Sequence, residues 1–554
     1  MTQIWFGPKN RGYTTVVTPN SGLTFPRVMA VMVGGDQSYG CSAATGFPLW
    51  TTASNGSAAN NAIQSIGAYD IAILNGSVEG YDASGQRDRE NLSLALLKGA
   101  LYTVKLSQTR RCLPFYYQMM MSGLASGSPY QQYFTLVQNN NWWLYESTGG
   151  TGTITPAGGG ASVVNYSTAW PGGIGSAGAG SSICGNNYGT SSAGSPTGLQ
   201  GPARTMGNYA ALKYVIRNSA GIDSRFSFNP QMASPSCGGI FMDNTFVALD
   251  GSGNGVIHDS SLDGITIAPG NQQGGGFPGL DTVQPVMARG NRNMFDQFQA
   301  MVATYQPGAT VYNFANFGQY ANAYQFGRTA LLGAGLDNLH GGLLENAMFS
   351  GNNAWEWFQR GNFGTGQLDP SGWANLLANY YLGMDFCLSP KLVGIGARFP
   401  TASTPSQFGV NGILTNVTQG SALEYQTMRY GLCTALMDDG YFAPGTVNGY
   451  DWQQLRWYDE YGDDSLTQVN VKRGYLGFPK TSRPIAPAFA GGTFGGWLRL
   501  FDNGKVLVNP RGNGVQTYNI SGTRLLGSQQ PSINNGATVT SVTLQDGDGA
   551  ILLN

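Results

Sequence analysis

Short runs of hydrophobic residues recur along this chain, and most of them close on polar side chains. Unbroken apolar runs of this length, bounded by Gly, Asn or Asp, are typical of strands that are buried on both faces. Eight such runs are candidate strands, at residues 27–35, 69–77, 113–121, 237–246, 309–317, 340–348, 391–399 and 435–443.

The segments between these runs carry hydrophobic residues at helical spacing. Candidate helices are residues 87–104, 203–221, 291–305, 371–388 and 421–434. Buried strands that alternate with amphipathic helices pair in parallel through right-handed crossovers. Eight such units predict an α/β fold, a closed (β/α)8 TIM barrel with long Gly-rich loops.

The pattern changes near residue 470 to alternating strands with an Asp-Asn-Gly turn at 502–504. We therefore expect three parts: a short N-terminal extension (1–26), a barrel (27–470) and a C-terminal β-rich domain (471–554).

Composition narrows the chemistry. The formal net charge is −1 and only 11% of residues are charged, which gives no electrostatic reason to expect nucleic acid binding. No apolar stretch is long enough to span a membrane, and no signal peptide is visible. The two histidines, His258 and His340, and six cysteines without a CxxC pair argue against a metal site, and we expect no cofactor. Catalysis, if present, would rest on carboxylates.

In a TIM barrel, chemistry lies where the strands end at their carboxyl-terminal rim. Polar residues are found there in this chain. They include Asp36, Asn75, Asp243, Asn313, Asn316, Glu345, Asp438 and Asp439.

Four stretches together resemble the hypothetical glycosyl hydrolase family fifteen, a family of glycosidase-like barrels. They are IFMDNTF (240–246), DDGYF with RWYDEYGDD (438–464), GYLGFP (474–479) and WLRLFDNGKVLVNP (497–510). The resemblance covers the chain after residue 27, weakly through the Gly-rich insertions at 148–200 and 250–285. It implies a barrel and kinship with glycosidases more firmly than it implies a substrate.

The resemblance also implies roles for particular acids. Asp243 would be the nucleophile or base, and Glu345 the general acid, its pKa raised by apolar neighbours. Asp438 is an alternative to Glu345. A turn-capping role remains open for Asp243, and for Glu345 catalysis and structure are evenly balanced.

Residues 435–464 concentrate acids among aromatic rings, a combination suited to binding sugar hydroxyls and stacking on sugar faces. Core packing would also explain Trp457, and a helix cap or a solvent-exposed position would explain Asp459 and Glu460. For Asp438 and Asp439 the functional interpretation is favoured. The candidate substrate-binding residues are Asp36, Asn75, Asn313, Trp355, Asp439, Trp457, Asp459 and Glu460.

Two functions follow. The first is a glycoside hydrolase acting on a poly- or oligosaccharide. The second is a carbohydrate-binding or structural surface protein without catalysis, such as a phage virion or tail component. The low charge, the Gly/Ser/Asn/Thr richness and the lack of a visible signal fit an extracellular or virion-surface location, with homo-oligomer or virion assembly left open.

Overall fold

The structure is a computed structural model of the 554-residue chain. It describes residues 24–32, 69–74, 113–119, 122–124, 144–147, 162–163, 183–185, 239–243, 256–259, 292, 294–304, 312–316, 336–348, 372–397, 420–444, 457–462 and 469–554.

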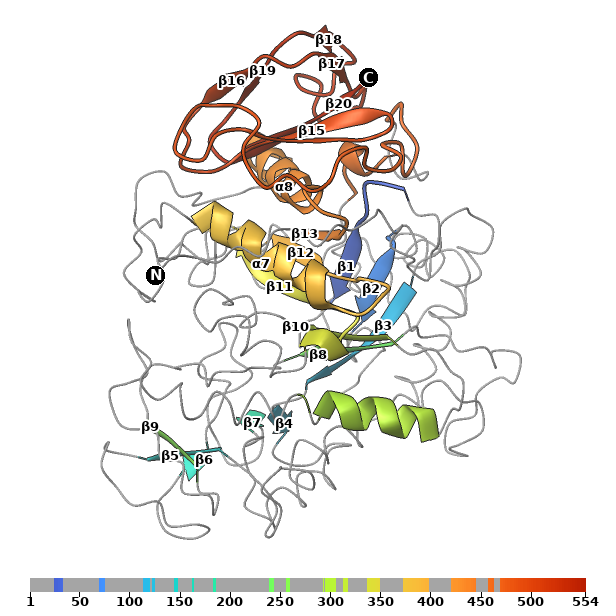
Figure 1. The fold of residues 1–554 in the computed structure, drawn as a ribbon, viewed down its shortest axis with the longest axis vertical. Helices are drawn as coiled ribbons and strands as arrows, with labels where there is room; N and C mark the ends of the chain where they lie inside the picture. The colour runs from blue at the N-terminus through green and yellow to red at the C-terminus, as the bar shows by residue number, and fades with distance from the viewer. Residues whose placement is uncertain are drawn as a thin grey trace, which may run out of the picture.

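Eight strands form one sheet, and each lies within or overlaps one of the eight hydrophobic runs (Figure 1). Every neighbouring pair is parallel, in the chain order that successive crossovers would produce. The strands are β1 (Met29–Met32), β2 (Ile71–Leu74), β3 (Leu113–Met119), β8 (Gly239–Asp243), β10 (Tyr312–Asn316), β11 (Gly341–Met348), β12 (Gly394–Ala397) and β13 (Tyr441–Pro444).

The two outermost strands of this sheet, β1 and β13, meet. Val28 forms a parallel bridge with Phe442, and the Phe442 amide donates to the Arg27 carbonyl at 3.1 Å. Residues from both outermost strands, among them Met29 and Tyr441, share a buried apolar cluster with Phe241, Phe314 and Leu343 from the central strands. One face of the sheet therefore surrounds a common core.

Three of the predicted helices fall within the described residues: 294–304, α7 (Gly372–Phe386) and α8 (Ala422–Ala435). Ser421 caps the start of α8: its side chain accepts from the Glu424 amide at 3.2 Å, while Glu424 Oε2 accepts from the Gly420 amide. This resembles a capping box, shifted by one residue on its return bond. The predicted helices 87–104 and 203–221 lie outside the described residues.

The C-terminal region forms an antiparallel sheet in the order β14-β15-β20-β17-β18. Its strands are β14 (Trp497–Leu500), β15 (Gly504–Asn509), β17 (Gly522–Arg524), β18 (Thr538–Val539) and β20 (Asp548–Leu553), and β16 (Gln516–Tyr518) pairs separately with β19 (Val542–Leu544). The predicted Asp-Asn-Gly turn joins β14 to β15, and the Phe501 amide closes it by donating a hydrogen bond to the Gly504 carbonyl at 2.8 Å.

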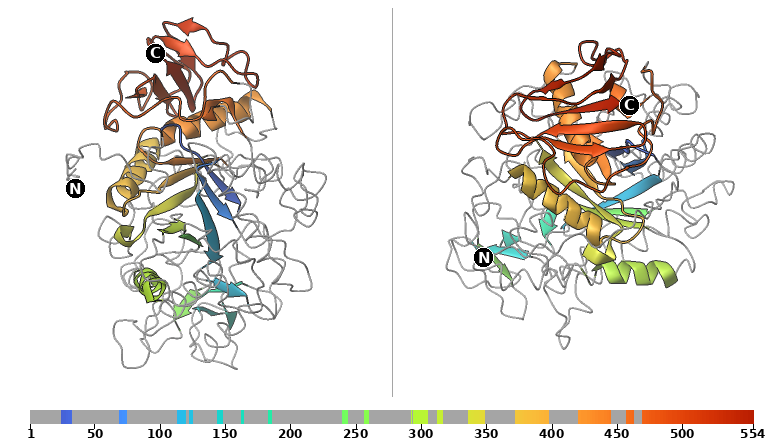
Figure 2. Two further views of the ribbon diagram at one scale, coloured as in Figure 1. Left: turned by 90° about the vertical axis from the view of Figure 1, so that its right-hand side faces the viewer. Right: turned by 45° about the horizontal axis from the view of Figure 1, so that its top comes forward.

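Short strands also form in the segments that follow β3 and β8. Strand β4 (Ser122–Leu124) pairs with β7 (Ile183–Gly185), and β5 (Leu144–Ser147) lies between β6 (Ser162–Val163) and β9 (Val256–Asp259). Figure 1 and the left panel of Figure 2 show the β6-β5-β9 sheet at the end of the molecule opposite the C-terminal sheet, with the parallel sheet between them.

Candidate functional site

Parallel strands bring their carboxyl ends to one edge of a sheet, and three polar residues reach that edge on neighbouring strands. Asp243 is the last residue of β8, Asn316 is the last residue of β10, and Glu345 lies in the second half of β11. The order β8-β10-β11 makes these strands consecutive.

The spacing along each strand gives these three positions a common relation to buried core residues. Phe241 pairs with Phe314, and Asn316 pairs with Leu343. Asp243, Asn316 and Glu345 each follow a buried member of the apolar cluster, Phe241, Phe314 or Leu343, by two residues. In β8 and β10 the period of two puts positions 243 and 316 in the same columns of the sheet as Phe241 and Phe314. The pairing of β11 with β12 shifts register between Leu344 and Met348, so Glu345 is placed only in the second half of β11. The carboxyl edge is the candidate functional site.

Other predicted site residues cannot be compared in this way. Asp36, Asn75 and Trp355 lie outside the described residues, although Asn75 directly follows the last residue of β2, Leu74.

The structure corrects the expected position of Asp438 and Asp439. They were expected to end the eighth strand, but α8 runs to Ala435, both acids lie in the turn after it, and β13 begins only at Tyr441. They therefore precede the strand and lie at the amino-terminal edge of the sheet, opposite Asp243 and Glu345. The apolar run 435–443 was interpreted as one strand because it includes the apolar end of a helix, Leu436 and Met437.

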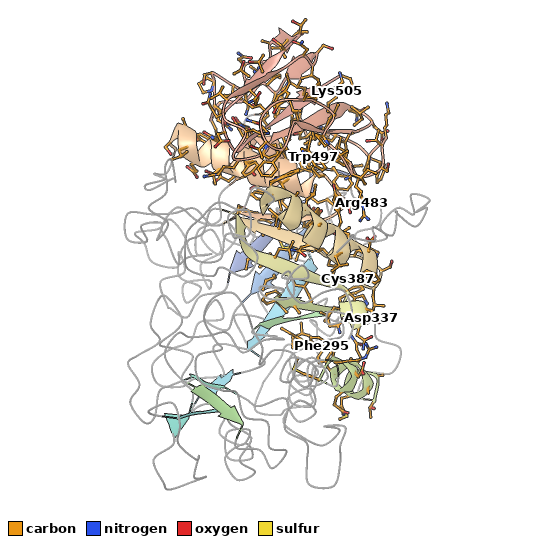
Figure 3. The ribbon with its side chains drawn as sticks, turned by 60° about the vertical axis from the view of Figure 1, so that its left-hand side comes forward. Phe295, Asp337, Cys387, Arg483, Trp497 and Lys505 are labelled. Carbon is orange, nitrogen blue, oxygen red and sulfur yellow. The ribbon has the colours of Figure 1, made fainter. Side chains whose placement is uncertain are left out.

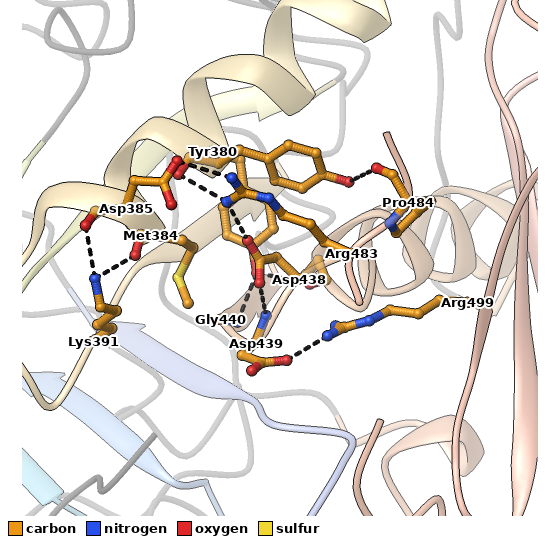
Figure 4. Close-up of polar contacts among 12 residues, drawn as sticks. Tyr380, Met384, Asp385, Lys391, Asp438, Asp439, Gly440, Arg483, Pro484 and Arg499 are labelled. Carbon is orange, nitrogen blue, oxygen red and sulfur yellow. Dashed lines mark hydrogen bonds and ion pairs between the residues drawn. The ribbon is translucent and has the colours of Figure 1, made fainter. Parts of the chain in front are cut away.

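Both acids at this edge are paired with arginines from the C-terminal region (Figure 4). Arg483 contacts Asp438 at 3.1 Å and Asp385 of α7 at 2.9 Å, and Arg499 contacts Asp439 at 2.6 Å. Burial and then the neighbouring Asp439 carboxylate raise the pKa of Asp438, and the two arginines oppose this shift. These ion pairs join α7 and the turn before β13 to the C-terminal region.

Asp459 and Glu460, which were expected to bind substrate, are buried and bonded within the chain. They lie in a 3-10 turn, Asp459–Tyr461. Asp459 accepts from the Gln529 amide at 3.1 Å, and Glu460 accepts from the side chains of Gln530 at 2.8 Å and Asn534 at 3.1 Å. Burial raises the pKa of both carboxyl groups. The acids of this stretch therefore anchor the C-terminal region.

Trp457 is also packed within the chain. Its ring lies edge-on to Tyr69 and Tyr461, the Arg473 guanidinium stacks 5.0 Å from its ring centre, and its indole N–H donates to the Gly462 carbonyl at 2.9 Å. Tyr69 precedes β2, so this aromatic group also lies at the amino-terminal edge.

Asn313 lies near the start of β10 and is fully buried. Its side-chain amide donates to the Asn338 carbonyl at 2.9 Å, and its side-chain oxygen lies 2.7 Å from Nδ1 of His340. It alternates with Phe314 and so occupies the opposite face of the sheet. The structure places it in a link to residues 338–340 rather than at the carboxyl edge.

Two further buried acids, Asp70 and Asp548, also pair with arginines, and the sequence did not predict these pairs. Arg473 pairs with Asp70 at 2.8 Å, and Arg429 of α8 pairs with Asp548 of β20 at 2.9 Å. The partners are 403 and 119 residues apart. A local pattern carries no signal for pairs at such separations.

No group of three or more His, Cys, Asp or Glu residues within the described ranges could hold a metal ion. Cys387 and Cys433 are buried free thiols. Over the same ranges, every helix is too short or too polar to cross a membrane.

Comparisons with known proteins add little to this geometry. A scan against protein-family models finds no matching family, and a search of curated proteins finds no match. Solved structures similar to this chain include AmyP in complex with maltose (9% identity, TM-score 0.36, 95% of this chain and 96% of that chain). Another is trehalose-6-phosphate hydrolase (TreA) of Bacillus licheniformis (8% identity, TM-score 0.38, 89% of this chain and 93% of that chain). At TM-scores below 0.5 these similarities establish neither the fold nor the function of this chain. The resemblance to family fifteen stays a prediction.

Proposed function

We propose that this chain is a glycoside hydrolase whose site lies at the carboxyl edge of a closed (β/α)8 barrel. The observation that supports this most strongly is the placement of Asp243 and Glu345 at one end of the same parallel sheet, each two residues beyond a buried core residue. The contact between β1 and β13 supports closure. In barrels of this kind, acids at the carboxyl ends of strands carry the chemistry.

The spacing of the two strands suits a carboxylate pair. Neighbouring strands lie about 4.8 Å apart, so β8 and β11, which are separated by β10, lie roughly 10 Å apart. Strands at this spacing are compatible with the carboxyl separations required, about 5–5.5 Å for retaining and about 6.5–9.5 Å for inverting hydrolysis.

The proposed mechanism assigns one role to each acid. Asp243, ionised, either activates a water that attacks the anomeric carbon, or attacks that carbon itself to form a glycosyl ester, which water then hydrolyses as Glu345 accepts the proton of that water. Glu345, protonated, donates its proton to the leaving glycosidic oxygen. Leu343 and Leu344, which precede Glu345, are buried, and an apolar setting disfavours the charged form of a carboxyl group. Asp36, Asn75 and Trp355 are proposed substrate contacts on the segments that follow β1, β2 and β11, with carboxylate and amide groups for hydroxyls and a ring for a sugar face.

The test is the release of new reducing ends from a panel of polysaccharides by the wild-type chain, Asp243→Asn and Glu345→Gln. A matched control is Asp296→Asn, since Asp296 is an exposed acid of helix 294–304. We expect each site variant to lose at least about a hundredfold in kcat with an unchanged circular dichroism spectrum, and the control to keep its activity.

Release that survives both site substitutions would refute the assigned residues. Absence of release from every substrate, with sugar binding retained in calorimetry, would replace hydrolysis by a binding function on the same scaffold.

A further inference from the structure

The place where β1 meets β13 is here called the seam. The backbone pairing at the seam consists, in the described residues, of the Val28–Phe442 bridge and the hydrogen bond from the Phe442 amide to the Arg27 carbonyl. Both strands have only four residues. Because a pair of strands this short gains little by itself, the seam needs support from neighbouring elements.

Residues 473–501, here called the strap, run across the amino-terminal edge at the seam. The Phe25 amide donates to the Gly477 carbonyl at 3.0 Å, and the Leu476 amide donates to the Phe25 carbonyl at 3.0 Å. The strap thus extends the backbone pairing of the segment that leads into β1. Phe25 also packs against Phe501, with ring centres 5.5 Å apart.

One buried carboxylate, that of Asp70, joins the strap to the segments that enter β1 and β2. Oδ2 of Asp70, just before β2, accepts from the Val28 amide at 2.9 Å and from Arg473 at 2.8 Å. The Asp70 and Arg473 side chains are 0% and 5% exposed. Val28 forms the seam bridge. Arg473 therefore neutralises the carboxylate that accepts a hydrogen bond from the Val28 amide.

A second arginine supports the other side of the seam. Arg499 donates to the Leu436 carbonyl at 3.0 Å and to the Asp439 carboxylate at 2.6 Å. The Asp439 carbonyl accepts in turn from Arg27 at 2.9 Å. This chain of contacts runs from β14 through the turn before β13 to the segment that enters β1. Figure 4 shows Arg499 directed at Asp439, with Arg483 on Asp438 beside it.

Several ion pairs link the C-terminal region to elements that precede residue 445. Arg473, Arg483 and Arg499 pair with acids that precede residue 445, and Arg429 of α8 pairs with Asp548 of β20. Figure 3 shows Arg483 and Trp497 where the C-terminal sheet approaches α7. The packing there includes the Trp373–Trp497 contact, with ring centres 4.7 Å apart.

We propose that the strap closes the parallel sheet at its seam, and that the C-terminal sheet is therefore an integral part of the folding unit rather than an independent module. A substrate site at the carboxyl edge would depend on this closure at the opposite edge. The inference itself rests only on residues at the amino-terminal edge and stands whether or not the chain hydrolyses sugars.

Hydrogen exchange of the full-length chain tests the proposal. Arg473→Met would leave the Asp70 carboxylate buried without its guanidinium. We expect exchange in residues 24–32 and 69–74 to rise on the order of a hundredfold or more. The double variant Asp70→Asn/Arg473→Met removes the buried carboxylate charge together with the arginine, while Asn keeps an oxygen for the Val28 amide, and it should return exchange to within about tenfold of wild type.

Arg292→Met is the control, because the Arg292–Asp337 ion pair does not involve the strap. The two side chains are 38% and 41% exposed. It should leave the seam unchanged. Faster exchange confined to residues 469–480 in Arg473→Met, or a double variant no better than the single one, would overturn the proposal. If the single variant fails to fold, the double variant alone decides.

The wild-type chain in a urea series provides a second measurement. The proposal requires residues 392–397 of the parallel sheet and 504–509 of the C-terminal sheet to lose protection at the same midpoint. Protection of 504–509 that persists after 392–397 has exchanged would show that the C-terminal sheet is an independent module.

Discussion

His340 should make this protein lose stability as the pH falls below neutrality. Its ring is largely buried, packed edge-on against Tyr312 with Nδ1 next to the Asn313 side chain. Burial lowers the pKa of His340 from 6.5 to about 4. The folded chain therefore keeps the imidazole neutral at pH values where the unfolded chain protonates it.

The sign and size follow from that difference. Stability contributed by the neutral ring is fully present above pH 6.5 and is lost progressively as the pH falls to about 4, below which both states are protonated. A difference of roughly 2.5 pH units at 1.36 kcal/mol per unit corresponds to about 3 kcal/mol.

The assay compares wild type with His340→Asn by urea unfolding between pH 4 and 7.5. Asparagine places an amide near the position of Nδ1 but does not titrate. Taking the difference between the two proteins removes the contribution of all other groups, including buried acids such as Asp438 and Glu460, whose raised pKa values act in the opposite direction.

We expect the stability advantage of wild type over the variant to decrease by about 3 kcal/mol from pH 7 to pH 4. A difference that stays constant over this range would show that the ring is hydrated enough to titrate normally, which would refute the argument from burial.

Two further predictions concern buried groups. Replacing Arg483 by Met strands the buried Asp438 carboxylate and should lower the free energy of unfolding by about 3–5 kcal/mol, and Asp438→Asn in the same chain should restore most of it; a loss below about 1 kcal/mol in urea unfolding would show that solvent reaches the acid. Burial raises the pKa of Cys387 to about 12, so at pH 8 the native chain should react with iodoacetamide at Cys387 only after unfolding, as peptide mass analysis would show, and rapid labelling of the folded protein would contradict this.

Much of the parallel sheet could be predicted because its signal is local. A strand covered on both faces must be apolar over its whole length, so runs such as 237–246 and 340–348 identify β8 and β11 without any knowledge of their neighbours. The helices before β10, β12 and β13 follow for the same reason. The position of Asp243 and Glu345 at the carboxyl edge needs only the strand boundaries and the parallel order.

The eighth strand shows where local signals fail. Leu436 and Met437 are buried after the end of α8, so the apolar run extends from helix to strand across a turn that contains Asp438 and Asp439. A shift of a few residues in the boundary moved both acids from one edge of the sheet to the other. Trp457, Asp459 and Glu460 were predicted to bind substrate but are packed and hydrogen-bonded within the chain. Acids among aromatic rings are compatible both with a sugar site and with buried contacts between segments.

The sequence by itself determined the parallel strands and several helices, because each depends on residues close together in the chain. Only the tertiary structure decided which acids are buried in ion pairs with arginines. Asp70, Asp438 and Asp439 are neutralised by arginines from the strap, and no local pattern records a pairing over such separations. Burial sets a high cost on an unpaired charge, so the partner, rather than the acid, determines what the acid does.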